Sequence, residues 1–172
     1  GIPCHTAPET PGSINEGGEL GYSLAHAFGA VMDNPGLIAA CVVGDGEADE
    51  GQIWEAVMAA YRYQLDNLVV VIDNNGLQID GTTDEIMPQL DLTKKFDAFG
   101  YDTYEIDGHN MEQIMETFDK IHAAKDGRPK FINAHTVKGK GVSYMENQLA
   151  WHGMAPNDEQ YQQAMRELEE GI

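Results

Sequence analysis

Two hydrophobic patterns alternate along this chain. The first pattern begins after Gly17-Gly18 and has apolar residues at helical spacing, namely Leu20, Leu24, Ala27, Phe28 and Val31. Residues 33–36 end this pattern. Residues 37–43 then form a continuous apolar run, which is typical of a strand buried on both faces of a parallel sheet. The same alternation continues and predicts strands at 37–43, 68–73, 101–106 and 131–136, with further helices at 52–63, 92–99, 111–124 and 157–170.

This order of elements predicts an α/β fold with an open, mostly parallel sheet and helices on both faces. Residues 74–90 contain Gly, Thr and Pro without a clear period, so we expect a long loop there rather than an element. A chain of 172 residues suffices for one sizeable core but not for two ordinary ones. We therefore expect residues 1–172 to form a single domain.

Charge and composition narrow the classes of partner. The net charge of -19 argues against nucleic acid or an anionic membrane surface, because both would be repelled. No stretch is apolar for long enough to predict a membrane span. The two cysteines, Cys4 and Cys41, are too few for a disulfide framework and favour a reducing, cytoplasmic location. An anionic ligand would need a local device such as a divalent metal or a helix amino terminus.

Candidate chemistry follows two of the predicted strands. Gly44-Asp45-Gly46-Glu47 comes after the first strand, and Asn74-Asn75-Gly76 comes after the second. Both turns would lie at the carboxyl edge of the sheet, where such folds bind ligands. The Asp45 carboxylate, the Asn75 amide oxygen and a loop carbonyl such as that of Leu77 would suit Mg²⁺ or Ca²⁺, with phosphate oxygens and water completing the coordination. The alternative is that Asp45 and Asn75 only shape two β-turns.

Longer motifs carry a family resemblance. The run GDGEADEGQIWEAVMAAYRYQLDNLVVVIDNNGLQIDG resembles the thiamin diphosphate and Mg²⁺ motif of transketolases, and the resemblance continues through YEIDGHNMEQI, HTVKGKGVSYMEN and WHGMAP, covering residues 37–172. The run HTAPETPGSINEGGELGYSLAHAFGA, at residues 5–30, is instead similar to phosphoketolases, a related thiamin diphosphate family that acts on sugar phosphates. Asn15 stands where phosphoketolases usually carry a histidine.

The resemblance implies a set of cofactor contacts. Asp45, Asn75 and the backbone carbonyl of Leu77 would be the metal ligands. The cofactor-binding set further comprises Gly44, then Gly46 and Glu47 along the diphosphate, Ile79 near the thiazolium ring, and Gly18, Glu19 and Leu20 at the start of the first helix. For Gly17-Gly18 the alternative is a plain junction between loop and helix.

Three residues match catalytic or interface positions of the resembled families. His152 matches a transketolase histidine that contacts the diphosphate and assists proton transfer at the substrate. His5 matches an active-site histidine of phosphoketolases. Glu50 matches a glutamate of the transketolase subunit-interface network, or it is only an acidic residue in the first turn of a helix.

The implied function is transfer of a two-carbon ketol unit between sugar phosphates, as in the pentose phosphate pathway. In the resembled families a second domain binds the aminopyrimidine and supplies an activating glutamate, and nothing in these 172 residues resembles it. The chain also begins without Met. We therefore expect a fragment, or one subunit of a homo- or hetero-oligomeric enzyme such as a dimer, that is inactive without a pyrimidine-binding partner.

Alternative functions stay open at this point. A phosphoketolase-type domain would cleave ketose phosphates with inorganic phosphate to give acetyl phosphate. The dehydrogenase E1 components and deoxyxylulose-phosphate synthase are more distant, because the sequence around QIDGTTDE favours transketolase. From a different class, the chain would be a non-catalytic module for cofactor binding or dimerisation.

Overall fold

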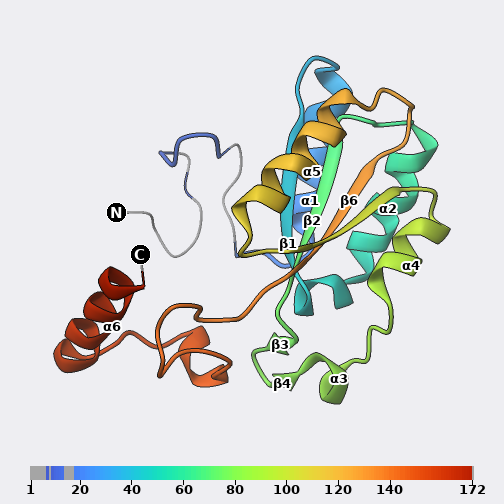
Figure 1. Cartoon of the computed structure of the whole chain (residues 1–172). Helices are drawn as coiled ribbons and strands as arrows, with labels where there is room; N and C mark the ends of the chain where they lie inside the picture. Colours follow the sequence, from blue (N-terminus) through green and yellow to red (C-terminus); the bar gives the residue numbers. More distant parts are fainter. Residues whose placement is uncertain (1–6, 8, 14–17, 172) are drawn as a thin grey trace.

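The computed structural model describes residues 7, 9–13 and 18–171 and contains a four-stranded parallel sheet. The strand order is β1-β2-β6-β5, with β1 at Ala39–Gly44, β2 at Leu68–Asn74, β5 at Asp102–Asp107 and β6 at Lys130–His135. The main helices are α1 (Tyr22–Asp33), α2 (Gly51–Arg62), α4 (Leu92–Ala98), α5 (Met111–Ala123) and α6 (Asp158–Glu170). The predicted α/β fold, with helices on both faces of the sheet, is thus confirmed (Figure 1).

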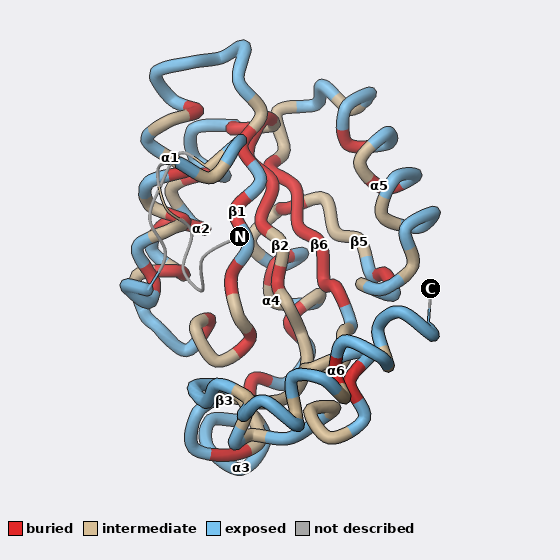
Figure 2. The backbone as a smooth tube through the Cα atoms, turned by 90° about the vertical axis from the view of Figure 1, so that its left-hand side faces the viewer, coloured by how far each residue is buried: buried red, intermediate tan, exposed pale blue. Residues whose placement is uncertain are grey.

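The larger core lies between the sheet and helices α1, α2 and α4. Alternate residues of β1 and β2 face it, and Phe131 of β6 stacks on Phe96 of α4 with ring centroids 3.8 Å apart. Buried residues are concentrated along β1, β2 and β6, while the outer helix surfaces are exposed (Figure 2). Cys41 belongs to this core as a free cysteine, and burial raises the pKa of its thiol to about 11. Cys41 therefore acts as a small buried hydrophobic residue of this core.

The opposite face of the sheet is covered less completely. Helix α5 packs there through Ile121, with Ile114 and Phe118 partly buried against the strands. Beyond the helix, Val42 of β1 is 65% exposed. A cavity of about 530 Å³ lies on this face and is lined by Val42, Phe118 and neighbouring residues. Parallel sheets are normally covered on both faces. In this protein the face is left open beside β1.

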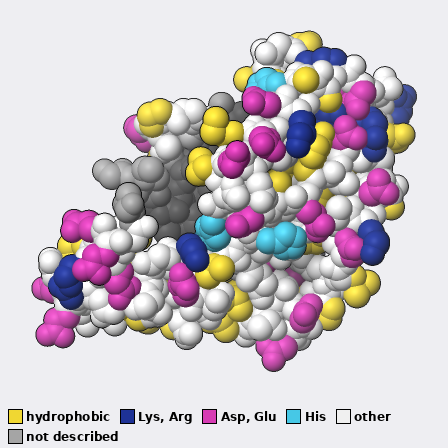
Figure 3. Space-filling view, in the orientation of Figure 1, with side chains coloured by type: hydrophobic (Ala, Val, Ile, Leu, Met, Phe, Trp, Pro, Cys, Tyr) yellow, Lys and Arg dark blue, Asp and Glu magenta, His cyan; other side chains and the backbone are white. Residues whose placement is uncertain are grey.

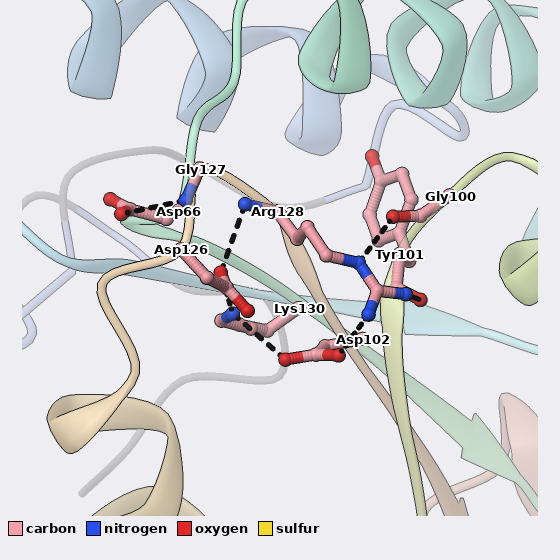
Figure 4. Close-up of polar contacts among 8 residues, drawn as sticks. All are labelled: Asp66, Gly100, Tyr101, Asp102, Asp126, Gly127, Arg128 and Lys130. Carbon is pink, nitrogen blue, oxygen red and sulfur yellow. Dashed lines mark hydrogen bonds and ion pairs between the residues drawn. The ribbon is translucent and has the colours of Figure 1, made fainter.

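A charged cluster closes the amino-terminal edge of β5 and β6 (Figure 4). The fully buried Lys130 places its ammonium 2.6 Å from the carboxylate of Asp126 and 3.0 Å from that of Asp102. Arg128 pairs with the other oxygen of Asp102 at 2.7 Å and donates to the main-chain oxygens of Gly100 and Tyr101. The cluster lies at the edge away from the polar turns, so its role is to hold strands together.

The predicted loop at residues 74–90 is wrong in part. It contains a short antiparallel hairpin, β3 (Leu77–Gln78) with β4 (Gly81–Thr82), and a one-turn helix α3 (Thr83–Ile86). The helix begins with a capping box in which Thr82 accepts from the N–H of Glu85 and the Glu85 carboxylate accepts from Thr82. These elements are too short to produce a hydrophobic period, which is why the pattern missed them.

Helix α1 begins later than its pattern suggests. Gly21 is its N-cap with φ 84°, and Leu20 precedes the helix with 55% of its surface exposed. At the other end of the chain, α6 lies apart from the sheet (Figure 1). It is joined to the turn before it by hydrogen bonds from the amide and hydroxyl of Ser143 to Glu167. Within the described residues, no helix is both long and apolar enough to cross a membrane.

Candidate functional site

The polar turns at the carboxyl edge of the sheet enclose a cavity of about 350 Å³. Its walls come from the start of α1, the end of β1, the end of β2 with the hairpin that follows, and the loops after β6. The lining residues are Leu20, Gly44, Asp45, Gly46, Glu47, Asp73, Asn75, Leu77, Gln78, Ile79, Asp80, Lys138 and His152. Residues predicted from separate motifs are therefore brought together in one place.

Asp45 is the buried anion of this cavity, with 2% of its surface exposed. Its carboxylate accepts the backbone N–H of Gly46 at 2.7 Å through Oδ1 and that of Gly76 at 2.6 Å through Oδ2. Burial raises the pKa of Asp45 above its ordinary value, although the N–H groups of Gly76 and Gly46 oppose the shift. The register of β1 beside β2 explains the contact, because both strands end at this edge.

Asn75 is oriented by its own turn. Its amide oxygen accepts the N–H of Leu77 at 3.1 Å, and its amide nitrogen donates to Asp73 at 3.4 Å. Asp73 also accepts a hydrogen bond from the hydroxyl of Thr136 on the segment after β6. The negative charge of Asp73 contributes to raising the pKa of Asp45. A second carboxylate thus lies close to the first.

Glu47 connects the turn after β1 to the start of α1. Its carboxylate accepts from the N–H of Gly21 at 2.9 Å, from the hydroxyl of Ser23 at 3.3 Å and from the N–H of Gly44 at 3.2 Å. These three contacts hold the amino end of α1 against the end of β1. Glu47 lines the cavity and also fixes the shape of its wall.

Lys138 and His152 form the basic side of the cavity. The ammonium of Lys138 lies 3.0 Å from Nδ1 of His152. Because an ammonium can only donate, Nδ1 is the acceptor and the neutral imidazole carries its proton on Nε2. Across the visible face of the molecule, acidic side chains are scattered widely, and histidines lie near the middle and near the top (Figure 3). This pair therefore provides local positive charge and hydrogen-bond donors in an acidic protein.

Comparisons with known proteins show the family to which this chain belongs. The model of the family described as "XFP N-terminal domain" matches residues 1–150. The chain belongs to the XFP N-terminal domain family. This match covers most of the chain, including both polar turns and Lys138.

Individual relatives of this XFP N-terminal domain protein include transketolase subunits and phosphoketolases. The chain is 44% identical over 172 residues to an apulose-4-phosphate transketolase subunit of Phocaeicola vulgatus, covering 98% of this chain and 61% of the relative. It is 48% identical over 129 residues to a probable phosphoketolase of Clostridium acetobutylicum, covering 70% of this chain and 16% of the relative. Similarity to phosphoketolases is thus not limited to residues 5–30.

A solved structure shows the same fold at larger scale. Transketolase from Campylobacter jejuni superimposes with a TM-score of 0.81 and 27% identity, covering 90% of this chain and 26% of the transketolase chain. The resemblance to transketolases and phosphoketolases is confirmed. This chain spans only 61% of the length of the transketolase subunit that it matches.

The donor groups at the cavity fit a divalent cation shared with a phosphorylated ligand. In the described part of the chain, no three His, Cys, Asp or Glu side chains come together as a metal site. A cation at Asp45 would thus need further oxygen ligands from Asn75, the Leu77 carbonyl and a bound phosphate. The carboxylates of Asp45 and Asp73 favour a cation, and the cation in turn would admit an anionic ligand.

Four predicted site residues lie outside this cavity or outside the described residues. Gly18 and Glu19 are exposed and precede α1, and they do not line the cavity. Glu50 is the exposed N-cap residue of α2, which is consistent with its simpler interpretation as a helix-end acid. His5 lies outside the described residues. The proposed roles of all four stay predictions.

Sequence patterns alone miss several residues of the site. They assign no role to Lys138, which the structure places beside His152, although a basic residue in a chain of net charge -19 was an available signal. Asp73, Gln78 and Asp80 also line the cavity. Gln78 approaches the turn closely, since a Cβ on Gly46 would lie 2.7 Å from the Cβ of Gln78. Gly46 is therefore needed for contact with the hairpin.

Proposed function

We propose that this chain is the diphosphate- and metal-binding part of a transketolase-type transferase. It would bind thiamin diphosphate with Mg²⁺ or Ca²⁺ and act in transfer of a two-carbon ketol unit between sugar phosphates. The observation that carries the proposal is the convergence of Asp45, Asn75, Leu77 and His152 on one cavity at the carboxyl edge of the sheet. The curated relative named for apulose 4-phosphate, a sugar phosphate, supports the substrate class.

Each part of the cavity has a distinct role in this proposal. Asp45, Asn75 and the Leu77 carbonyl would hold the metal, and the bound metal would offset the negative charge of the diphosphate. Thiamin diphosphate, when bound, supplies the electron sink for making and breaking the carbon–carbon bond. Lys138 donates to His152 and keeps the imidazole in one tautomer, so the Nε2 proton is available to an oxygen of the ligand or substrate.

The hydrophobic wall of the cavity would face the reactive end of the cofactor. Leu20 and Ile79 both line the cavity and are 55% and 65% exposed. In the segment between β2 and α4, which also contains Ile79, Met87 is 55% exposed and Leu90 is 87% exposed. Exposed apolar side chains beside a polar cavity are typical of a surface that a partner covers. They support a pyrimidine-binding partner, either a further domain or a separate chain.

A phosphoketolase-type reaction is the second candidate. Identity to the probable phosphoketolase of Clostridium acetobutylicum is 48%, compared with 44% for the transketolase subunit. The transketolase subunit, however, matches 98% of this chain, whereas the phosphoketolase matches 70%. The longer match favours ketol transfer over cleavage by inorganic phosphate.

Reconstitution with a pyrimidine-binding transketolase subunit tests the proposal. The mixture is given thiamin diphosphate, Mg²⁺, a ketose phosphate donor and an aldose phosphate acceptor, with and without inorganic phosphate. We expect a new ketose phosphate that forms without inorganic phosphate and only when both chains are present. Acetyl phosphate formation would favour the phosphoketolase reaction instead. A verified complex that binds the cofactor but gives neither product would favour a non-catalytic module.

A further inference from the structure

Gln89 contacts the Asp45 turn from behind the cavity. It lies between α3 and α4 and is only 7% exposed. Its amide nitrogen donates to the main-chain oxygen of Asp45 and, at 2.8 Å, to the carboxylate of Asp49. Both acceptors belong to the turn after β1, so this buried amide joins that turn to the segment that follows β2, the hairpin and α3.

Asp45 is thereby held on both its side chain and its backbone. At the start of the segment between β2 and α4, the N–H of Gly76 donates to the Asp45 carboxylate at 2.6 Å. Near the end of the same segment, Gln89 donates to the Asp45 carbonyl, which also accepts the N–H of Ala48 at 3.1 Å. The hairpin and α3 lie between these two contacts. The position of Asp45 thus depends on both ends of this segment.

The backbone beside Gln89 adopts an unfavourable conformation. Leu90 has φ 56°, in the left-handed region that a residue with a branched side chain seldom adopts. Its side chain is 87% exposed, so burial of Leu90 does not explain the conformation. On either side the chain is anchored, by Gln89 pointing inward and by Leu92, which is 3% exposed. Such strain persists where the surrounding contacts fix the backbone, and here they direct Gln89 at Asp45.

We propose that Gln89 is a positioning residue that sets the Asp45 turn for binding of the divalent metal and diphosphate. This inference depends on the proposed function. The neutral amide suits the role because one NH₂ group serves a carbonyl and a carboxylate together. A glutamate at this position would place acceptors against acceptors. A methionine would fill the space but leave the buried Asp45 carbonyl without this donor.

The test compares Gln89→Met and Gln89→Glu with a matched change at another buried amide. Asn67 is also 7% exposed, and its amide donates to the main-chain oxygen of Leu37 at 2.9 Å, near the other edge of the sheet. The variant Asn67→Leu therefore loses a comparable buried contact far from the cavity. For each folded protein, Mg²⁺ is titrated calorimetrically at a fixed concentration of thiamin diphosphate. Amide hydrogen exchange is measured without ligand.

We expect the Gln89 variants to bind Mg²⁺ roughly 10–100-fold more weakly, as is usual when a contact behind a metal ligand is removed. The N–H groups of Ala48 and Gly76 should exchange faster in these variants. Asn67→Leu should unfold at a lower temperature yet keep the wild-type Mg²⁺ affinity. This difference distinguishes positioning of the site from a general loss of stability.

Two results would overturn the inference and can be told apart. If the wild type shows Mg²⁺-dependent binding and both Gln89 variants match it, only the role of Gln89 is wrong. If the wild type shows no metal-dependent binding at all, the proposed function fails and the inference fails with it. Should Gln89→Glu not fold, Gln89→Met carries the same comparison because it preserves the volume of the side chain.

Discussion

The indole nitrogen of Trp54 donates a hydrogen bond to the main-chain oxygen of Ala48 at 2.9 Å. Trp54 belongs to α2, whereas Ala48 lies in the short 3₁₀ helix at Gly46–Asp49 that directly follows Asp45. The Trp54 ring also stacks on Phe99, with centroids 5.9 Å apart. The indole is therefore fixed to the wall of the cavity, and movement of that wall changes its surroundings.

This contact predicts a fluorescence response to the cofactor. In a Trp151→Phe background, thiamin diphosphate with Mg²⁺ should change Trp54 emission, because the metal acts on the turn to which the indole is bonded. The near-isosteric Asp45→Asn should lose the response. Asp66→Asn is the control. Among the described hydrogen bonds, the Asp66 carboxylate accepts only from the N–H of Gly127, and neither residue lines the cavity. An equal response in Asp45→Asn would argue against Asp45 as a metal ligand.

Lys138 and Lys140 should differ although they share one turn. Lys138 lines the cavity beside His152, whereas the Lys140 ammonium lies 3.9 Å from Glu146 on the surface. Hydrogen bonds to charged groups contribute about 1.5–3 kcal/mol, so Lys138→Gln should weaken thiamin diphosphate binding by roughly one to two orders of magnitude. Lys140→Gln should leave it unchanged. Equal losses would indicate a general charge effect instead of a local contact, and calorimetry at two salt concentrations checks this.

Gly46 should not tolerate a side chain. The added Cβ of Gly46→Ala would meet the Cβ of Gln78 at 2.7 Å, so the hairpin must move. Overpacking of this kind costs about 1–3 kcal/mol, and we expect lower stability together with weaker cofactor binding. Gly29→Ala, in the middle of α1 with open space around its Cβ, should instead stabilise the protein by about 0.5–1 kcal/mol. If Gln78→Gly does not restore binding to Gly46→Ala, the clash is not the cause.

The charged cluster at the other edge of the sheet predicts a pH dependence of stability. The hydrogen bond from Lys130 lowers the pKa of Asp126 from 3.8 to about 2. A lowered carboxyl pKa stabilises the fold above the unfolded value and loses this effect as pH falls through the folded value. The stability difference between wild type and Asp126→Asn should therefore shrink from about pH 4 to about pH 2.

Urea unfolding across this pH range measures that difference. Asp119→Asn, on the exposed side of α5, is the control for a change of net charge. A difference that stays constant over the whole range would show that Asp126 does not act through its ionised form.

Much of the fold was predictable because its core is periodic. The continuous apolar runs of β2 and β6 correspond to buried strands. The run of β1 is equally continuous, but its residues alternate between buried and exposed, because the face of the sheet beside Val42 is open. The hairpin and α3 were missed because they are held by turn chemistry and a capping box, which leave no hydrophobic period. The hydrophobic pattern starts helix α1 too early, since Leu20 fits the helical spacing but precedes the Gly21 cap.

The candidate site was predictable where strand ends carry it. Asp45 and Asn75 follow neighbouring strands, so the topology alone brings them together. Lys138 and Gln89 reach the site from loops whose paths no local pattern describes. Gln89 in particular is separated from Asp45 by α2, β2 and the hairpin, and its contact depends on tertiary structure.

Calorimetric titration of the chain with thiamin diphosphate tests the central claim most directly. The titration is run with Mg²⁺, with EDTA, and with thiamin lacking the diphosphate. We predict saturable binding that requires both Mg²⁺ and the diphosphate and that is lost in Asp45→Asn. Binding of equal strength in EDTA, or of thiamin as tightly as thiamin diphosphate, would contradict the claim.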